Sequence, residues 1–229
     1  MSHSLRTRFD EAGTMPTYVI VPVHESRAAK TRLATALSRN ERVSLSLAML
    51  SDVLDALRGT KTLERIVIVT RDIEVARVAK ANGVRILWEG QSRGLNAAVM
   101  KGIRFAEREC ADRVLVVPAD VPLAKPEDFT RILKTGRQNH VLIVPSHDRG
   151  GTNALLLSPP SIMPVSYGRN SFKRHYRLAR KRSLRVGILN LPSLQLDVDT
   201  PADLRRIQLA DGMTRSQRLL RTKRQVRRS

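Results

Sequence analysis

The sequence predicts an α/β protein: a single-domain, three-layer α/β/α fold with helices on both faces of a mixed, mostly parallel sheet. Three observations support this fold class. Short apolar runs alternate with longer segments of helical periodicity, as in repeated strand–helix units. The apolar runs lack polar/apolar alternation, which is typical of strands covered on both faces. The chain has 229 residues, 41% of them hydrophobic, which is enough for one sizeable core.

The first half of the chain contains four predicted strands, at residues 17–23, 65–70, 84–88 and 114–117. The helix after the first strand has the clearest signals, because Ser38 and Glu41 have the spacing of a capping box. An apolar stripe at helical period follows, formed by Val43, Leu47, Leu50, Val53, Leu54 and Leu57. A second, short helix ends at Gly83, and a third follows Gly94 and runs to about Glu109.

The second half contains three further predicted strands, at residues 140–146, 153–158 and 184–190. A very basic helix is predicted from about Ser171 to Arg182, and Thr200-Pro201 opens a last helix. The expected organisation is a flexible leader (1–16), one domain (17–210) and a basic C-terminal tail (211–229). The tail has few apolar residues to anchor it, so we expect it to be helical or frayed and dispensable for catalysis.

The composition excludes several classes of protein. Cys110 is the single cysteine, so no internal disulfide can form, and no Cys/His cluster has the spacing of a zinc site. The longest apolar runs are far shorter than a membrane span, and the N-terminal segment lacks the apolar region of a secretory signal. These features predict a cytoplasmic protein without a membrane partner.

The charge is strongly positive, with a formal net charge of +20. Two stretches without acidic residues, 169–185 and 213–229, carry eight and seven Lys or Arg residues. A basic surface indicates either nucleic acid or small phosphorylated ligands. Aromatic residues make up only 3%, which leaves few stacking platforms for single strands, so nucleic acid is the less favoured partner.

Candidate functional residues directly follow the predicted strands. In open α/β sheets, ligands bind beyond the carboxyl ends of the strands. Asp120 ends the fourth strand between Pro118 and Pro122, and such stiffness suits a carboxylate that must be fixed in place. Lys30 and Arg32 lie in the loop after the first strand, where they either bind phosphate or belong to a solvated surface.

Carboxylates recur near the C-terminal end, where Asp197 and Asp199 are two residues apart. In an extended segment, residues at this spacing point to the same side. Two or three carboxylates without neighbouring Cys or His suit Mg²⁺ rather than zinc. The alternative is that Asp199 or Thr200 caps the last helix.

Two regions combine glycines with hydroxyl or amide side chains. Gly94 allows close approach of the backbone to a ligand, and Asn96 either binds a hydroxyl group or belongs to a simple helix start. Thr152 follows two glycines that can form an amide-rich concavity for an anion, and Gly168 and Ser171 flank the start of the basic helix. A helix N-terminus with a hydroxyl and cations favours a phosphate or carboxylate. The alternative is a turn followed by a solvated basic face.

Six stretches then stand out together: VPVHESRAAKTRLA, RGLNAAVMKGI, VPADVPL, GGTNALLL, YGRNSFKRHYRLA and LDVDTPADL. In order and spacing they resemble the phospholactate guanylyltransferase family, over about residues 17 to 210. The resemblance implies the nucleotide-diphospho-sugar transferase fold and a place in the biosynthesis of the deazaflavin coenzyme F420. It also implies a reaction in which GTP and a phosphorylated three-carbon acid combine with release of pyrophosphate. The acid is 2-phospho-L-lactate, phosphoenolpyruvate or 3-phospho-D-glycerate in different members.

The resemblance assigns roles to the candidate residues. The acid substrate would contact Thr152, Gly168 and Ser171. The cofactor Mg²⁺ would be held by Asp120 together with Asp197 or Asp199. The GTP phosphates would meet Lys30 and Arg32, and the nucleoside would meet Gly94 and Asn96. The expected catalytic residues are Lys30, Arg32 and Asp120. This chain has His24 where family members commonly have Lys.

Two other function classes stay open. One is a different nucleotidyltransferase of the same fold, with molybdopterin or a sugar phosphate as acceptor. The other is a nucleic-acid-binding protein that uses the basic tail. For the enzyme we expect a homodimer whose partners are GTP and the phosphorylated acid.

Overall fold

The computed structural model describes residues 16–23, 30–60, 63, 65–91 and 93–226, and its centre is one seven-stranded sheet. The strand order is β3-β2-β1-β4-β6-β5-β7. Every neighbouring pair is parallel except the two pairs that include β6. The sheet is therefore mixed and mostly parallel, as the sequence predicted.

The strands lie close to their predicted positions. Their bounds are β1 Thr17–Pro22, β2 Arg65–Thr70, β3 Arg85–Trp88, β4 Arg113–Val116, β5 Val141–Pro145, β6 Thr152–Leu157 and β7 Val186–Ile188. The helices are α1 Arg39–Arg58, α2 Ile73–Ala81, α3 Leu95–Arg108, α4 Pro126–Thr135, α5 Ser171–Lys181, α6 Pro192–Gln195, α7 Pro201–Leu209 and α8 Arg215–Val226. Short 3₁₀ turns form at η2 Thr31–Leu33 and η3 Gly136–Gln138.

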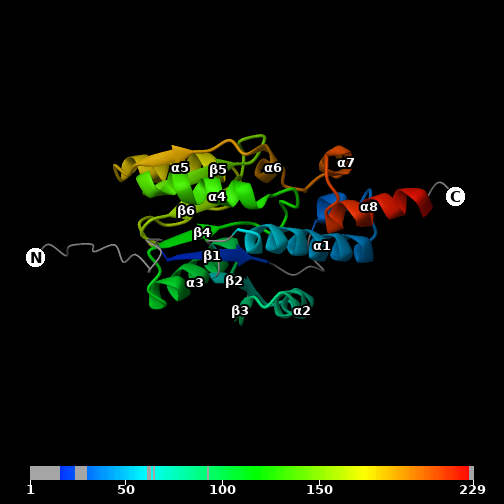
Figure 1. Ribbon diagram of the computed structural model, residues 1–229, viewed down its shortest axis with the longest axis horizontal. Coiled ribbons are helices and arrows are strands. Elements are labelled where there is room, and N and C mark those ends of the chain that lie inside the picture. The colour runs from blue at the N-terminus through cyan, green and yellow to red at the C-terminus, as the bar shows by residue number, and fades with distance from the viewer. Residues whose placement is uncertain (1–15, 24–29, 61–62, 64, 92, 227–229) are drawn as a thin grey trace, which may run out of the picture.

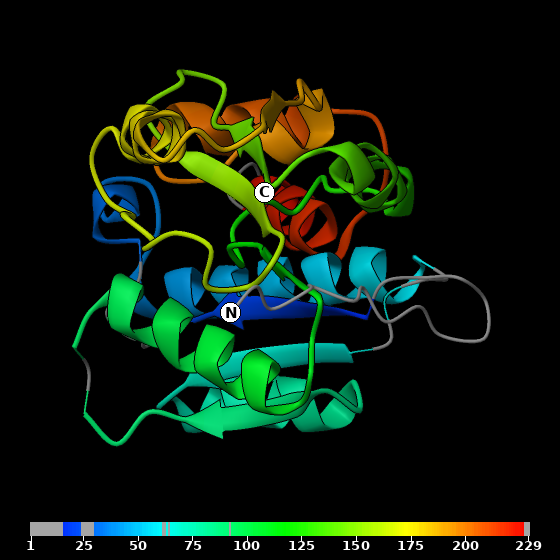
Figure 2. The same cartoon turned by 90° about the vertical axis from the view of Figure 1, so that its left-hand side faces the viewer.

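Helices cover both faces of the sheet, which gives the predicted three layers (Figures 1 and 2). On one face, α1, α2, α4 and α6 pack on alternate strand residues such as Val19 and Val21. On the other face, α3 and α5 pack on the intervening residues such as Tyr18 and Ile20. Because successive strand residues point to opposite faces, β1 is buried throughout and contributes side chains to both cores.

The helix starts follow their local signals. Ser38 and Glu41 form the predicted capping box at α1, with Ser38 accepting from the Glu41 N–H and Glu41 accepting from the Ser38 N–H. Thr200 caps α7 in the same way with Asp203. Helix α4 was not predicted, although Pro126 at its first turn, followed by acidic residues, is a usual helix start.

The basic tail, which was expected to be helical or frayed, contains the helix α8, which lies beside α1 (Figure 1). The Asp52 carboxylate on α1 accepts the N–H groups of Arg215 and Ser216 at 2.7 and 3.0 Å. Gln217 is fully buried and donates to the carbonyls of Ile207 and Ala210. Contacts of this kind attach the helix by polar side chains, so the low apolar content of the segment did not reveal its anchoring.

Leu220 of α8 completes a third apolar cluster with Leu33, Leu45, Val198 and Ile207. This cluster joins the loop after β1 to the C-terminal helices. No helix among the described residues is long and apolar enough to cross a membrane.

Candidate active site

Three residues far apart in the sequence meet at the carboxyl edge of the sheet. Lys30 Nζ donates to Asp120 Oδ2 at 2.6 Å and to Asp199 Oδ1 at 2.7 Å. We call Lys30, Asp120 and Asp199 the Lys30 cluster. Only 10% of the Lys30 side chain is exposed, against 27% for Asp120 and 45% for Asp199, so the ammonium is enclosed and the carboxylates remain accessible.

The fold explains why these residues meet. Strands β1 and β4 are paired in parallel, so the loop with Lys30 and the turn with Asp120 leave the sheet at the same edge. Lys30 adopts a left-handed backbone conformation (φ 58°) at the start of the η2 turn. The Val198 N–H donates to the Asp120 carbonyl at 3.0 Å, which fixes the segment with Asp199 beside Asp120.

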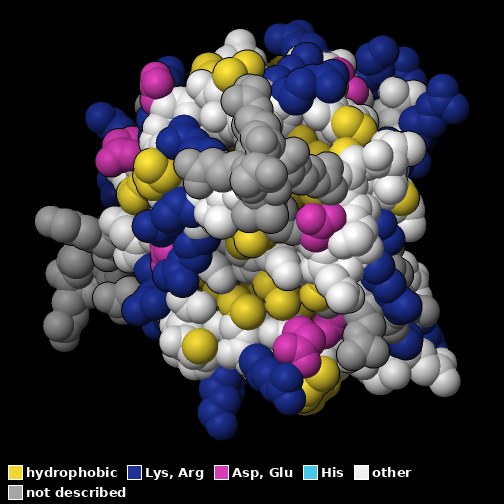
Figure 3. All heavy atoms as spheres, turned by 90° about the vertical axis from the view of Figure 1, so that its right-hand side faces the viewer, with side chains coloured by type: hydrophobic (Ala, Val, Ile, Leu, Met, Phe, Trp, Pro, Cys, Tyr) yellow, Lys and Arg dark blue, Asp and Glu magenta, His cyan; other side chains and the backbone are white. Residues whose placement is uncertain are grey.

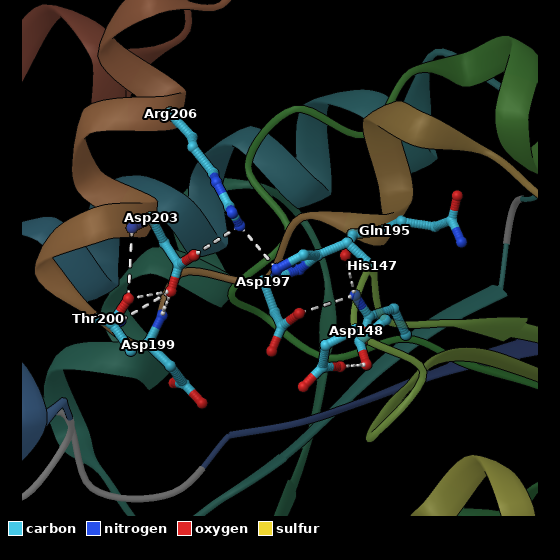
Figure 4. Close-up of polar contacts among 10 residues, drawn as sticks. His147, Asp148, Gln195, Asp197, Asp199, Thr200, Asp203 and Arg206 are labelled. Carbon is cyan, nitrogen blue, oxygen red and sulfur yellow. Dashed lines mark hydrogen bonds and ion pairs between the residues drawn. The ribbon is translucent and has the colours of Figure 1, made fainter.

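The structure separates the two roles that the sequence left open for Asp199 and Thr200. Thr200 is the cap of α7, and the Asp203 carboxylate accepts its N–H and hydroxyl at 2.9 and 2.7 Å (Figure 4). Asp199 is therefore free to pair with Lys30. Figure 4 also shows the carboxylates of Asp197 and Asp199 pointing to the same side of their segment, as their spacing predicts.

The charges around Lys30 do not balance. Burial lowers the pKa of the Lys30 ammonium, but the charges of Asp120 and Asp199 outweigh burial and raise this pKa above its usual value. The pKa of the Asp197 carboxyl is also raised, by burial first and then by the charge of Asp120, while a hydrogen bond from Asn153 at 3.2 Å opposes the shift. Two carboxylates thus share one ammonium, and the Asp197 carboxyl lies close enough to Asp120 to feel its charge.

This charge pattern fits a divalent cation that is shared with a ligand. Among the described residues, no three His, Cys, Asp or Glu side chains are placed to hold a metal ion by themselves. Mg²⁺ usually takes one or two carboxylates from the protein and completes its shell with water and substrate phosphates. Asp120 and Asp199 offer accessible oxygens for this purpose, with Asp197 beside them.

A cavity of about 260 Å³ opens next to the Lys30 cluster. Its apolar lining includes Leu47 and Met49 of α1, Val75 of α2 and Leu95 of α3. Ligand pockets usually measure about 300–1,000 Å³, so this cavity has room for part of a nucleotide rather than for all of it. Figure 3 views the side toward which β1 points, where Lys and Arg side chains are widespread and acidic side chains gather in a few places.

The other predicted nucleotide contacts are Arg32, Gly94 and Asn96, and they differ in their hydrogen bonds and in the space around them. Arg32 is exposed on η2. Gly94 precedes α3 with φ 86°, a conformation that favours glycine, and the space that a β-carbon would occupy there is open, with no contact within 4 Å from the described residues beyond its chain neighbours. The Asn96 side chain accepts the Tyr167 N–H at 2.7 Å and donates to the Tyr167 carbonyl at 3.2 Å. Asn96 therefore ties the start of α3 to the loop that leads to Gly168.

The predicted acid-binding residues Thr152 and Ser171 lie together in a buried chain of hydrogen bonds with His175. The Ser166 N–H donates to His175 Nε2 at 2.8 Å, which leaves the proton of the neutral imidazole on Nδ1. Nδ1 then donates to Thr152 Oγ1 at 3.1 Å, and the Ser171 hydroxyl lies 3.2 Å from the same oxygen. Whichever hydroxyl donates to the other, one hydroxyl proton is left for an anionic ligand.

His175 is fully buried on α5. Burial, and then the charge of Arg174, lower the pKa of its imidazole to about 4, so the ring is neutral at pH 7. Sequence reasoning missed His175 because it lies within a run of basic residues that looked like a solvated face. A usable signal was present, since Ser171 and His175 are four residues apart and share one helix face.

Strand β6 brings this hydroxyl pair to the site, because β6 is antiparallel to β4 and its first residue, Thr152, lies at the edge where β4 ends. Asn153, which sequence reasoning also missed, links the same strand to Asp197. The predicted amide concavity before Thr152 is not open. The Gly150 N–H donates to Asp148 at 2.8 Å and the Gly151 N–H donates to Ser146 at 2.6 Å.

Gly168 lies in the loop before α5 with φ 112°, where side chains are strained. A β-carbon there would also approach the Arg174 guanidinium at 3.1 Å. Gly168, Thr152 and Ser171 thus lie together at one end of α5, and their binding of the acid stays a prediction. His24 and the leader lie outside the described residues, apart from Pro16.

Two solved structures with similar folds are named as nucleotide-handling transferases. A protein of Desulfovibrio desulfuricans assigned to the nucleotide-diphospho-sugar transferases aligns with a TM-score of 0.77 at 20% identity, over 94% of this chain and 98% of the other. A nucleotidyl transferase of Methanothermobacter thermautotrophicus aligns with a TM-score of 0.62 at 17% identity, over 90% of this chain and 99% of the other. These likenesses show the predicted nucleotide-diphospho-sugar transferase fold.

Sequence relatives are more specific. A phosphoenolpyruvate guanylyltransferase of Rubrobacter xylanophilus is 39% identical over 87% of this chain and 97% of its own length. A 2-phospho-L-lactate guanylyltransferase of Methanothermobacter thermautotrophicus is 38% identical over 90% of this chain and 91% of its own length. The family model described as guanylyl transferase, CofC like, matches residues 17–227. This chain therefore belongs to the CofC-like guanylyl transferase family.

Proposed function

We propose that this chain transfers a guanylyl group from GTP to a phosphorylated three-carbon acid, as a step of coenzyme F420 biosynthesis. Family membership supports the reaction type, and the relatives named for phosphoenolpyruvate or 2-phospho-L-lactate support the class of acceptor. The observation that carries the proposal is the Lys30 cluster at the carboxyl edge of the sheet, next to a cavity and to the Thr152–Ser171 hydroxyl pair. It favours nucleotide chemistry over nucleic-acid binding, and the names of the relatives favour a phosphorylated acid over a different acceptor.

The proposed chemistry needs no nucleophilic side chain. A phosphate oxygen of the acid forms a bond to the α-phosphorus of GTP, and the bond from this phosphorus to the oxygen that bridges to the β-phosphate breaks. Pyrophosphate leaves with that oxygen and its electron pair. Since the attacking oxygen already carries negative charge, the protein contributes alignment and charge neutralisation.

Each half of the site has a separate task in this proposal. Lys30 supplies positive charge to the leaving pyrophosphate, and Arg32 lies on the following turn where it can meet the same phosphates. The remaining hydroxyl proton of Thr152 or Ser171 binds an oxygen of the acid, and the left-handed Gly168 leaves room beside it. His175 holds the orientation of the hydroxyl pair from behind.

Asp120, together with Asp199 or Asp197, would hold Mg²⁺, which supplies neutralisation of the phosphate oxygens when it is bound. The site supports this assignment by its own charge. A triphosphate carries several negative charges, and the carboxylates of Asp120 and Asp199, which share one ammonium, would repel it unless a cation lay between them. The cytoplasmic location and the homodimer stay predictions from the sequence.

The test is an assay of the full chain with GTP, Mg²⁺ and each acid in turn: phosphoenolpyruvate, 2-phospho-L-lactate and 3-phospho-D-glycerate. We expect pyrophosphate release with one acid well above the other two, and no release from the Asp120→Asn variant, which should keep its fold. If the wild-type chain releases no pyrophosphate with any of the three acids, the proposed acceptor class is wrong. Normal turnover by Asp120→Asn would remove Asp120 from the site.

A further inference from the structure

A second hollow lies at the carboxyl end of β3 and contains a buried carboxylate. The Glu89 N–H donates to the Thr70 carbonyl at 2.8 Å, which holds Glu89 at the edge where β2 and β3 end. Glu89 is only 7% exposed, and its Oε2 has no hydrogen-bond donor among the described residues. Most buried polar atoms in proteins have a partner, and a carboxylate oxygen without one is unfavourable. A ligand that brings donors would remove this cost.

The same hollow is lined by basic side chains that do not pair with Glu89 in the described part of the chain. Lys101 donates instead to the Trp88 carbonyl, and Arg104 Nε donates to the Met100 carbonyl at 3.2 Å. The hollow also includes Arg93 and Arg108. The hollow therefore offers a carboxylate, which only accepts hydrogen bonds, and several Lys and Arg side chains, which only donate them and, among the described residues, do not pair with that carboxylate.

Guanine complements this combination. Its N1–H and N2 amino group form a pair of donors that one carboxylate can accept, because an ionised carboxylate only accepts. Its O6 and N7 atoms are acceptors that an Arg or Lys side chain can donate to. Adenine has an acceptor at N1 and a donor amino group at C6, so both of its groups would meet like partners in the hollow.

Neighbouring residues of α3 line this hollow and the cavity beside the Lys30 cluster. The first turn of α3 contributes Leu95 to the cavity with Lys30 and Asp120, and Ala97 to the hollow with Glu89. Strands β1, β2 and β3 are all parallel, so both openings lie beyond the same edge of the sheet. A nucleotide that crosses the start of α3 would place its phosphates at Lys30 and its base at Glu89.

We propose that Glu89 reads the guanine base of GTP by accepting the N1–H and N2 amino donors, with the basic side chains of the same hollow facing O6 and N7. This inference rests on the proposed use of GTP and adds the residue that selects the base. Sites that hydrogen-bond a substrate group discriminate strongly against analogues that lack it.

The test compares guanine with hypoxanthine nucleotides, because hypoxanthine lacks only the N2 amino group. For the wild-type chain we expect kcat/KM with ITP to be about ten- to hundredfold lower than with GTP, since one charge-assisted hydrogen bond is missing. In Glu89→Gln this preference should shrink toward unity, through a raised KM for GTP, while the KM for the acid stays the same. Glu107→Gln is the matched control, because Glu107 is exposed on α3 and does not line the hollow.

Calorimetric binding of GDP and IDP gives a readout that needs no acceptor acid. If no acid is turned over but GDP binds better than IDP only when Glu89 is present, the proposed reaction fails while the base assignment holds. If Glu89→Gln keeps the wild-type ratio of GDP to IDP affinity, the assignment is overturned. Should Glu89→Gln fail to fold, the wild-type comparison still decides, because equal binding of GDP and IDP contradicts the role of the N2 amino group.

Discussion

The Lys30→Met substitution tests how the active site is held together. Methionine keeps most of the volume of lysine but removes the ammonium that contacts Asp120 at 2.6 Å and Asp199 at 2.7 Å. The variant would leave two carboxylates facing each other without their shared cation. We therefore expect lower stability in the absence of divalent cations, together with loss of guanylyl transfer.

The exposure of the three side chains sets the size of the effect. Removing one partner of a buried ion pair costs about 3–5 kcal/mol, whereas exposed pairs contribute about 0–1 kcal/mol. Lys30 is 10% exposed but Asp199 is 45% exposed, so solvent screens part of the interaction and we expect a loss of about 2 kcal/mol. For a chain of this size that corresponds to a fall in Tm of about 4–8 °C.

The assay is denaturant unfolding at pH 7.5 with and without Mg²⁺. The pKa of the Lys30 ammonium is raised above its ordinary 10.5, so its contribution is fully present below that pH and is lost only at higher pH. Added Mg²⁺ should restore part of the stability of Lys30→Met, because a cation that binds the folded carboxylates favours the folded state. The control is Arg32→Met, which removes one exposed charge and should change stability by less than about 0.5 kcal/mol.

A double-mutant cycle with Asp199→Asn makes the test specific to the ion pair. If the pair couples the two residues, the double variant should lose less stability than the sum of the single variants, by about 0.5–3 kcal/mol. The reasoning is refuted if Lys30→Met unfolds at the same denaturant concentration as the wild type without Mg²⁺.

Three further predictions concern the acid pocket, the buried His175 and helix α8. Ser171→Ala should raise the KM for the acid about ten- to hundredfold and leave that for GTP nearly unchanged; an equal rise in both would place the acid pocket elsewhere. Stability should fall by about 3 kcal/mol as the pH drops from 6.5 toward 4, since the lowered pKa of His175 lets the unfolded chain bind the proton first; His175→Gln should flatten this part of the pH profile, and an unchanged profile would contradict it. Truncation after Gly212 should destabilise the protein by removing the contacts of α8 with Asp52 and the third apolar cluster, and an unchanged Tm would show that they contribute little.

The fold could be predicted because its signals are local. Buried parallel strands are apolar runs, and β1 and β2 were found within one residue of their bounds. The capping box at Ser38 fixed the start of α1. The docking of α8 could not be predicted in this way, since it depends on Asp52, which is more than 160 residues away along the chain.

Some residues of the candidate site could likewise be predicted from local signals, and others could not. Asp120, Thr152 and Ser171 follow or begin regular elements, so their place at an edge of the sheet could be inferred from order alone. Glu89 also follows a strand, β3, and His175 shares a helix face with Ser171, but neither position shows that the side chain is buried. A charged or basic residue in a polar stretch is usually solvated. Glu89 is only 7% exposed and His175 is fully buried, and burial is a property of the fold rather than of the neighbouring sequence.

The rigidity of Asp120 could be predicted from the sequence, but its ionic partner could not. Its neighbours predicted a fixed carboxylate, and the structure supports that rigidity: Val117 and Val121 are fully buried on either side, and the Asp120 carbonyl is held by the Val198 N–H. The sequence did not show what neutralises that carboxylate, since Lys30 is 90 residues away and Asp199 contacts Lys30 across 169 residues. The Asp120 carboxylate is partly exposed beyond the end of β4, and its ammonium partner comes from a separate segment, so its cation can be exchanged without rearranging the core. Such exchange is what a site needs if it is to bind and release phosphate ligands repeatedly.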